Sequence, residues 1–113
     1  GSFVQRGIGG ISRREDTALG NSRRMKSRTT PEFRALLAAL PAHVPKQARV
    51  AYRLFASDPK HPSLRFKQVH HDPPTYSARV GLAYRAVGVI GGDTVVWYWI
   101  GSHADYDQLL KQL

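Results

Sequence analysis

A chain of 113 residues is long enough for one domain with a single modest core. Its 17 lysines and arginines against 8 aspartates and glutamates give a net charge of +9, which favours a nucleic acid, an acidic protein or an anionic membrane face as partner. With no cysteine and no apolar run near the roughly 20 residues that span a bilayer, the chain cannot form disulfides, is not expected to enter a membrane and fits a cytoplasmic protein.

Residues 1–24 differ in composition from the rest of the chain. They are rich in glycine, serine and arginine and contain few regularly spaced apolar residues. Gly1-Ser2 resembles a protease cleavage scar, whereas Met25-Lys26 looks like a natural start. We therefore expect residues 1–24 to be a flexible N-terminal extension or a segment introduced by cloning, followed by one domain over residues 25–113.

Two helices are predicted at the start of this domain. The first begins near Thr29 with capping-box spacing and stops at Pro41. The second runs from about Pro45 to Ser57. In the first helix, apolar residues recur at helical spacing: Phe33, Leu36, Leu37 and Leu40. Two helices joined by a short loop form an antiparallel pair that needs another element to cover its apolar side.

A sheet is predicted to provide that cover. Patterns typical of strands occur at residues 64–70, 76–80, 84–90 and 95–100, and a short closing helix at residues 104–113, anchored by Leu109, Leu110 and Leu113. Because residues 95–100 are apolar on both faces, we expect them to form the central strand. The predicted fold class is α+β: two N-terminal helices packed on a four-stranded, mainly antiparallel sheet, with a short C-terminal helix.

Positive charge is concentrated in the middle of the domain. Five basic side chains there are candidate RNA-binding residues: Lys46, Arg49, Arg53, Arg65 and Lys67. The first three recur at helical spacing along the second helix. Such a stripe is either an ordinary solvated face or a surface that contacts a phosphate backbone.

The spacing of Arg79 and Arg85 makes a geometric prediction. If Gly81-Leu82-Ala83 is a three-residue loop, Val80 pairs with Tyr84, and the two arginines lie opposite each other on the same face of a hairpin. A two-residue loop would send them to opposite faces. Like charges directly opposed across a ladder destabilise it, so a same-face pair indicates a bound anion such as a phosphate.

His103 follows the last strand, where side chains leave the core. Histidine exchanges protons near neutral pH, so His103 is a candidate proton carrier. Tyr106 lies three residues further on, on the same helical face. The alternative is structural: Ser102 caps the last helix, and His103 merely occupies its first turn.

No other histidine arrangement supports a metal or a cofactor. His70 and His71 are adjacent, so in a strand they point to opposite faces and form a poor metal site. The lack of cysteine and the scattered acidic residues give little support to zinc or two-metal chemistry. We therefore expect no metal and no cofactor.

The order and spacing of these motifs resemble the RelE/ParE superfamily of bacterial type II toxin-antitoxin toxins over roughly residues 25–113. The resemblance rests on the two helices and on four motifs: the Asp58-to-Leu64 turn, Tyr76-Ser-x-Arg79-Val-Gly, Tyr84-Arg85 and Trp97-x-Trp-Ile-Gly-Ser-His103-x-x-Tyr106. It implies contact of Arg79 and Arg85 with a scissile phosphate, and proton transfer involving His103 and Tyr106.

The resemblance implies a metal-independent mRNA endonuclease that acts on the ribosome, inhibits translation and pairs with a cognate antitoxin in a hetero-oligomer. The attacking group would be the 2′-hydroxyl of the RNA itself. The sequence departs from the superfamily in two respects: the first strand is missing or reduced to Met25–Arg28, and an arginine replaces the usual lysine on the hairpin. Two alternatives stay open, a gyrase-inhibiting toxin of the same fold and a non-catalytic RNA-binding module.

Overall fold

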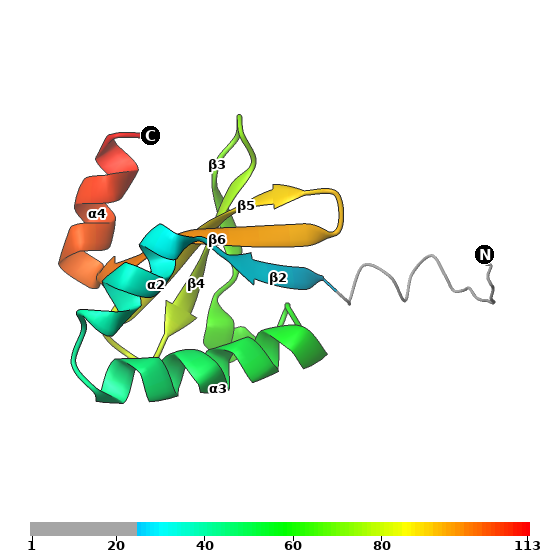
Figure 1. The fold of residues 1–113 in the computed structure, drawn as a ribbon. Coiled ribbons are helices and arrows are strands. Elements are labelled where there is room, and N and C mark those ends of the chain that lie inside the picture. The colour runs from blue at the N-terminus through cyan, green and yellow to red at the C-terminus, as the bar shows by residue number, and fades with distance from the viewer. Residues whose placement is uncertain (1–24) are drawn as a thin grey trace.

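A five-stranded mixed sheet organises residues 25–113, the part of the chain that the computed structural model describes (Figure 1). The strands are β2 (Lys26–Thr29), β3 (Lys67–His70), β4 (Thr75–Val80), β5 (Tyr84–Gly91) and β6 (Thr94–Ser102), in the order β2-β6-β5-β4-β3. The helices are α2 (Pro31–Ala38), α3 (His43–Ser57) and α4 (His103–Lys111), with a 3₁₀ turn, η1, at Pro62–Leu64. The extension predicted over residues 1–24 lies outside the described residues.

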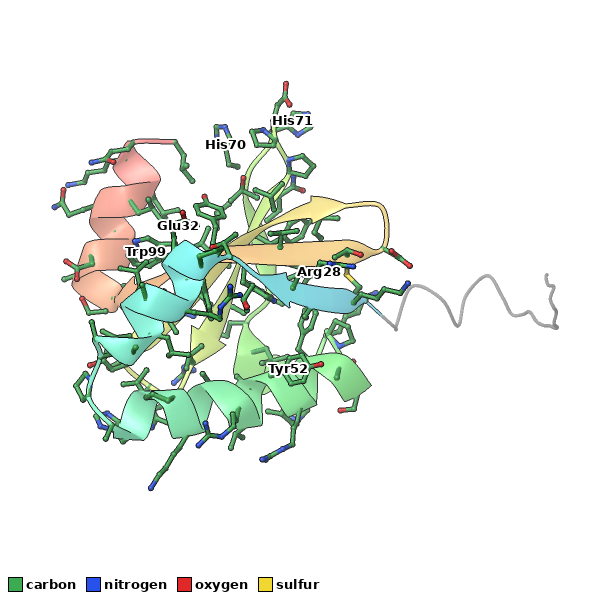
Figure 2. All side chains as sticks on the ribbon, in the orientation of Figure 1. Arg28, Glu32, Tyr52, His70, His71 and Trp99 are labelled. Carbon is green, nitrogen blue, oxygen red and sulfur yellow. The ribbon has the colours of Figure 1, made fainter. Side chains whose placement is uncertain are left out.

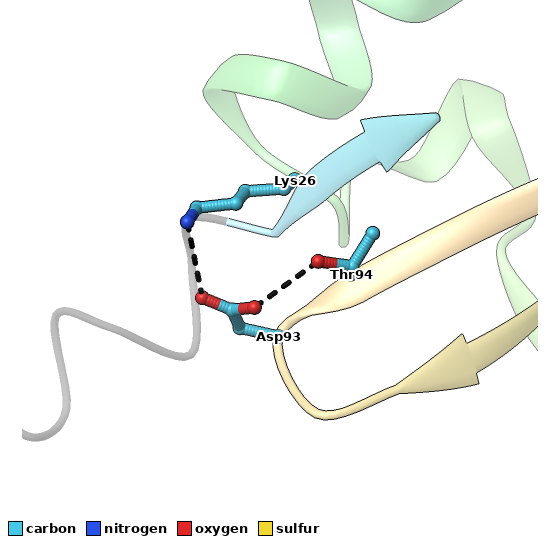
Figure 3. A network of polar contacts seen from close by, with 3 residues as sticks. All are labelled: Lys26, Asp93 and Thr94. Carbon is cyan, nitrogen blue, oxygen red and sulfur yellow. Dashed lines mark hydrogen bonds and ion pairs between the residues drawn. The ribbon is translucent and has the colours of Figure 1, made fainter. Parts of the chain in front are cut away.

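The predicted fold class is confirmed, but the sheet has one strand more than expected. Strand β2 pairs in parallel with β6, from Lys26 opposite Thr94 to Thr29 opposite Trp97. The Lys26 backbone N–H donates to the Asp93 carbonyl at 2.8 Å, and the Lys26 ammonium lies 3.9 Å from the Asp93 carboxylate, which also accepts from Thr94 (Figure 3). The prediction of four strands was wrong because β2 is short and polar, and its pairing with a distant strand leaves no local pattern.

Both N-terminal helices form where the sequence predicts them. The Thr30 hydroxyl accepts a hydrogen bond from the Phe33 N–H at 3.1 Å, which caps α2 directly before Pro31. Helix α3 begins two residues earlier than predicted, at His43, and runs alongside the sheet (Figure 1). The buried residues Phe33 of α2 and Val44 of α3 join these helices to the core.

The strand predicted over residues 64–70 is only half a strand. Pro62–Leu64 forms a 3₁₀ turn, and Arg65 adopts a left-handed conformation with φ of 46°, so pairing with β4 starts at Lys67. Leu64 is 2% exposed and packs in the core from the turn. The alternation of apolar and polar residues over 64–70 therefore comes from a turn followed by a short strand. The periodicity alone could not distinguish this arrangement from one continuous strand.

The core lies between the sheet and helices α2 and α3. Its buried side chains from the sheet are Ala78, Val80, Ala86, Val95, Trp97 and Ile100. Strand β6 is an interior strand, but the centre of the sheet is β5, so the prediction that residues 95–100 form the central strand was wrong by one position. Strand β2 pairs with the outer side of β6, which would otherwise be an edge strand.

Helix α4 closes the chain in a way the sequence did not predict. We expected Leu109, Leu110 and Leu113 to anchor it, but none of these leucines is fully buried. The buried residue of this helix is Tyr106, which is 4% exposed. A phenol therefore anchors α4.

Candidate functional site

The β4–β5 hairpin places two arginines opposite each other. Val80 pairs with Tyr84 across the loop formed by residues 81–83, and Arg79 pairs with Arg85. Gly81 has a φ of 61°, a left-handed conformation that glycine adopts without strain. The predicted register is confirmed, and both arginine side chains start from the same face of the sheet.

Arg85 is held against helix α4. Its guanidinium carbon lies 5.8 Å from the centroid of the Tyr106 ring, within the range of a cation–π contact. Its Nη1 atom is buried and has no hydrogen-bond partner among the described residues. A buried charged donor without an acceptor is costly, and an anion is the group that would satisfy it.

Arg79 extends toward a different element. Its Nε–H donates to the Gly81 carbonyl at 3.1 Å, so the side chain folds back over its own turn. There it lines a cavity of about 430 Å³ together with Gln47 and Val50 of α3 and with Leu82. The two arginine side chains therefore leave the sheet from the same face, but the Arg79 side chain extends toward α3 and the Arg85 side chain toward α4.

His103 is the first residue of α4 and is accessible to solvent. Its backbone N–H donates to the Ala83 carbonyl at 3.0 Å, which joins the helix start to the hairpin loop. The imidazole is 55% exposed, and its Nδ1 lies 3.3 Å from a carboxylate oxygen of Asp107. The Ser102 hydroxyl accepts from the Asp105 N–H, so the predicted cap exists as well. An imidazole with one nitrogen next to a carboxylate can present the other to a ligand.

Tyr106 does not lie where a phenol that takes part in proton transfer was expected. Its hydroxyl donates to the Ser77 hydroxyl at 2.9 Å in the interior, and Ser77 is 0% exposed. The Tyr106 ring contacts the His103 ring edge-on, with centroids 5.9 Å apart. The same ring contacts Arg85, so Tyr106 joins the two groups without facing solvent itself.

Sequence reasoning missed two residues of this site. Asp107 follows His103 at i+4 on the helix, a spacing that could have revealed the pair. Ser77 left no such signal, because its contact with Tyr106 joins residues 29 positions apart. Only the arrangement of the folded chain brings the two hydroxyls together.

The five predicted RNA-binding residues are all exposed to solvent. Lys46, Arg49 and Arg53 lie along α3, Arg65 follows the 3₁₀ turn, and Lys67 opens β3. This exposure is compatible with both predicted alternatives, a solvated face and a phosphate-binding face. Their role in RNA binding stays a prediction.

His70 and His71 lie away from this site. Figure 2 shows His70 and His71 where the β3–β4 connection projects beyond the sheet, far from Tyr52 on α3. Within residues 25–113, no three His, Cys, Asp or Glu side chains are grouped so that they could hold a metal ion. No helix in the same range is long and apolar enough to cross a membrane.

The aromatic residues of the strands are mainly structural. Trp97 is buried in the core, and its indole N–H donates to Ser27 of β2 at 3.3 Å. Tyr76 stacks on Phe66, with centroids 4.9 Å apart. Burial raises the pKa of Tyr98 above its ordinary value of 10.0, so its phenol stays protonated at neutral pH.

Comparison with known proteins identifies both a matching family and similar structures. Residues 42–108, more than half of the chain, match the family described as ParE-like toxin domain. The RelB-RelE antitoxin-toxin complex from Methanococcus jannaschii contains a similar chain, with 19% identity, coverage of 73% of this chain and 96% of that chain, and a TM-score of 0.58. The toxin-antitoxin complex RelBE2 from Mycobacterium tuberculosis contains another, with 25% identity, coverage of 73% and 94%, and a TM-score of 0.51.

A third similar structure shares the fold alone. It is a conserved hypothetical protein from Helicobacter pylori, with 16% identity, coverage of 71% of this chain and 96% of that chain, and a TM-score of 0.52. No curated protein matches the sequence.

Proposed function

Because this chain belongs to the ParE-like toxin domain family, within the RelE/ParE superfamily of toxins, we propose that it cleaves messenger RNA on the ribosome and thereby inhibits translation. The observation that carries the proposal is the arrangement around Tyr106. Its ring contacts both Arg85, whose buried Nη1 lacks an acceptor among the described residues, and the exposed imidazole of His103. A phosphate near these two groups would meet a permanent positive charge and a proton carrier.

In the proposed reaction, the 2′-hydroxyl of the RNA attacks the adjacent phosphorus and the bond to the 5′-oxygen breaks. The products are a 2′,3′-cyclic phosphate and a 5′-hydroxyl, and no metal ion is needed. His103 gives its proton to the departing 5′-oxygen, while water accepts the proton of the 2′-hydroxyl. General acid catalysis of this kind contributes about 10² to 10⁴ in rate.

The two arginines would stabilise charge on the phosphoryl oxygens. One well-placed donor of this type contributes about 3 kcal/mol to transition-state stabilisation. Arg85 is the better placed of the two, because its Nη1 has no acceptor within residues 25–113, whereas the Nε–H of Arg79 already donates to Gly81. Arg79 therefore holds the phosphate or the nucleotide next to it from the side of α3.

The exposed basic residues would hold RNA on either side of the cleaved bond. Lys67 contacts a flanking phosphate, and Arg65 and the α3 stripe contact ribosomal RNA, where their exposure leaves them free to meet a phosphate backbone. Tyr106 cannot contact the nucleotide with its buried hydroxyl, so its part in the reaction is indirect.

We also propose a cognate antitoxin as the protein partner. The similar chains from M. jannaschii and M. tuberculosis come from toxin-antitoxin complexes. In this chain an apolar cavity of about 370 Å³ lies between α2, α3 and the sheet, and Arg49 contributes to its lining. With a net charge of +9 on the chain, an acidic segment with apolar anchors would complement this surface.

Expression of the toxin in growing bacteria tests the proposed activity. Primer extension of cellular messages after induction should reveal new 5′ ends within coding regions for the unchanged chain. The His103→Ala variant should abolish both these cuts and growth arrest. His71→Ala is the matched control, because His71 is also exposed but lies at the β3–β4 tip.

The same experiment separates the alternative activities. Growth arrest that persists in His103→Ala and is accompanied by DNA damage signalling would identify a gyrase inhibitor. RNA binding without arrest or cleavage would identify a non-catalytic RNA-binding module. Either result overturns the proposed endonuclease.

A further inference from the structure

One buried hydrogen bond joins the hairpin strand β4 to helix α4. The Tyr106 hydroxyl donates to the Ser77 hydroxyl at 2.9 Å. Both residues are buried: Tyr106 is 4% exposed and Ser77 is 0% exposed. Tyr106 is the buried residue of α4. A phenylalanine ring would fill the same space. The added role of the hydroxyl is therefore its directional hydrogen bond, which fixes the position of α4 relative to Ser77 of β4.

The two ends of this bond lie next to the proposed catalytic groups. Ser77 precedes Arg79 by two residues and therefore shares its face of β4. At the other end, the Tyr106 ring contacts the His103 imidazole at 5.9 Å and the Arg85 guanidinium at 5.8 Å. A change in the position of this ring would move the imidazole relative to Arg85.

The other contacts between α4 and the hairpin do not fix the orientation of the helix. The His103 N–H donates to the Ala83 carbonyl and fixes the first residue of the helix. That bond can act as a pivot, because a single backbone bond does not fix the direction of the helix axis. The half-buried Leu109 and Leu110 pack without directional bonds. Tyr106, three residues after His103, supplies the second fixed point.

We propose that Ser77 and Tyr106 are positioning residues of the RNA-cleaving site, with their hydrogen bond setting the distance between His103 and Arg85. This inference rests on the proposed function. Neither residue is a catalytic residue, because both are buried and neither can touch the substrate. A positioning error of about 1 Å can cost on the order of 10² in rate, so a loss of turnover with little change in substrate binding is the expected signature.

A double-mutant cycle separates positioning from stability. The variants are Ser77→Ala, Tyr106→Phe and the double variant, and the measurements are kcat and KM on ribosome-bound message, the melting temperature and amide hydrogen exchange in α4. Each single variant leaves one buried hydroxyl unpaired and should lower the melting temperature, whereas the double variant leaves none and should regain most of it. In all three, kcat should fall about tenfold with KM within twofold, and α4 amides should exchange faster.

Thr75→Val is the matched control. Thr75 is also buried on β4, at 1% exposed, and its hydroxyl donates to the Pro73 carbonyl at 2.9 Å, away from α4. This variant should lower the melting temperature but leave kcat and α4 exchange unchanged. An equal loss of kcat in Thr75→Val would mean that any buried hydroxyl on β4 matters, and would overturn the inference.

The remaining outcomes distinguish this inference from the proposed function. A wild-type protein that cleaves no ribosome-bound message overturns the proposed function itself. If the wild type cleaves but Tyr106→Phe keeps its kcat, or if the double variant regains kcat together with its melting temperature, the inference alone is overturned. Unchanged exchange of α4 amides in Tyr106→Phe overturns it whatever the activity.

Discussion

Arg79 and Arg85 lie directly opposite each other on β4 and β5, so that two permanent positive charges start from one face of the hairpin. Like charges at directly opposed positions destabilise a ladder, and Arg85 adds the cost of a buried Nη1 with no acceptor within residues 25–113. The arrangement is consistent with selection for binding an anion rather than for stability.

Replacing Arg85 with an apolar residue should therefore stabilise the protein while it inactivates the site. Arg85→Met is expected to raise the free energy of unfolding by about 1 kcal/mol, because it removes a buried N–H donor that has no acceptor within residues 25–113. It should lower RNA cleavage about 100-fold, the usual cost of one phosphate-stabilising donor. Urea denaturation and a cleavage assay measure the two effects. Arg28→Met, on the exposed strand β2, should change neither. A marked loss of stability in Arg85→Met would contradict this account.

The basic stripe on α3 should contribute to RNA affinity through charge alone. Replacing Lys46, Arg49 and Arg53 with alanine removes three exposed cations. If these contact RNA phosphates, the slope of log affinity against log salt concentration should become shallower by about 2. Fluorescence titration of labelled single-stranded RNA at several salt concentrations measures the slope. The control is a variant of equal net charge in which Lys26, Arg34 and Lys111 are replaced with alanine. If its slope changes as much, the stripe on α3 is an ordinary solvated face and not an RNA contact.

Asp107 should support His103 modestly, by orienting its ring. The Asp107 carboxylate lies 3.3 Å from Nδ1 of His103, so Asp107→Asn should lower the rate of cleavage. Because both side chains are more than half exposed, at 55% and 56%, the effect should stay below about fivefold and disappear in high salt. Cleavage rates measured at low and at high salt would reveal it. Asp105→Asn makes the same charge change in the same helical turn, and should leave the rate unaltered.

The hairpin loop should be sensitive at Gly81. An added Cβ would clash with the Gln47 amide oxygen, but that side chain is flexible, so the main cost is the positive φ of 61°. We expect Gly81→Ala to lower the free energy of unfolding by about 1–2 kcal/mol. Gly91→Ala is the control, because nothing lies within 4 Å of its added Cβ. Urea denaturation of both variants tests the difference, and equal stability of the two would argue against a strained loop.

Local patterns in the sequence predicted much of this fold. The apolar spacing from Phe33 to Leu40 predicts α2, and the register of Arg79 with Arg85 follows from the length of the loop between their strands. These features depend on residues close in the chain, where side-chain periodicity and turn geometry act directly.

The features that sequence reasoning missed depend on partners far apart in the chain. Strand β2 exists because Lys26–Thr29 pairs with Thr94–Trp97, and its own residues carry no strand pattern. The burial of Tyr106 depends on Ser77, which no local spacing could indicate. For this reason sequence reasoning correctly predicted that Tyr106 lies near His103, but wrongly assigned its hydroxyl, which is buried against Ser77, to proton transfer.

The length of the three-residue loop between β4 and β5 determines two features of the site. The number of its residues determines that Arg79 faces Arg85, and the Ala83 carbonyl at its end receives the first N–H of α4. Deleting or inserting one residue would rotate one arginine to the other face and, in the same event, break the hydrogen bond from the His103 backbone N–H to the Ala83 carbonyl. Side-chain identity at position 82 matters far less, since Leu82 is 85% exposed. Natural variants should therefore differ at this position and rarely in the number of residues in the loop.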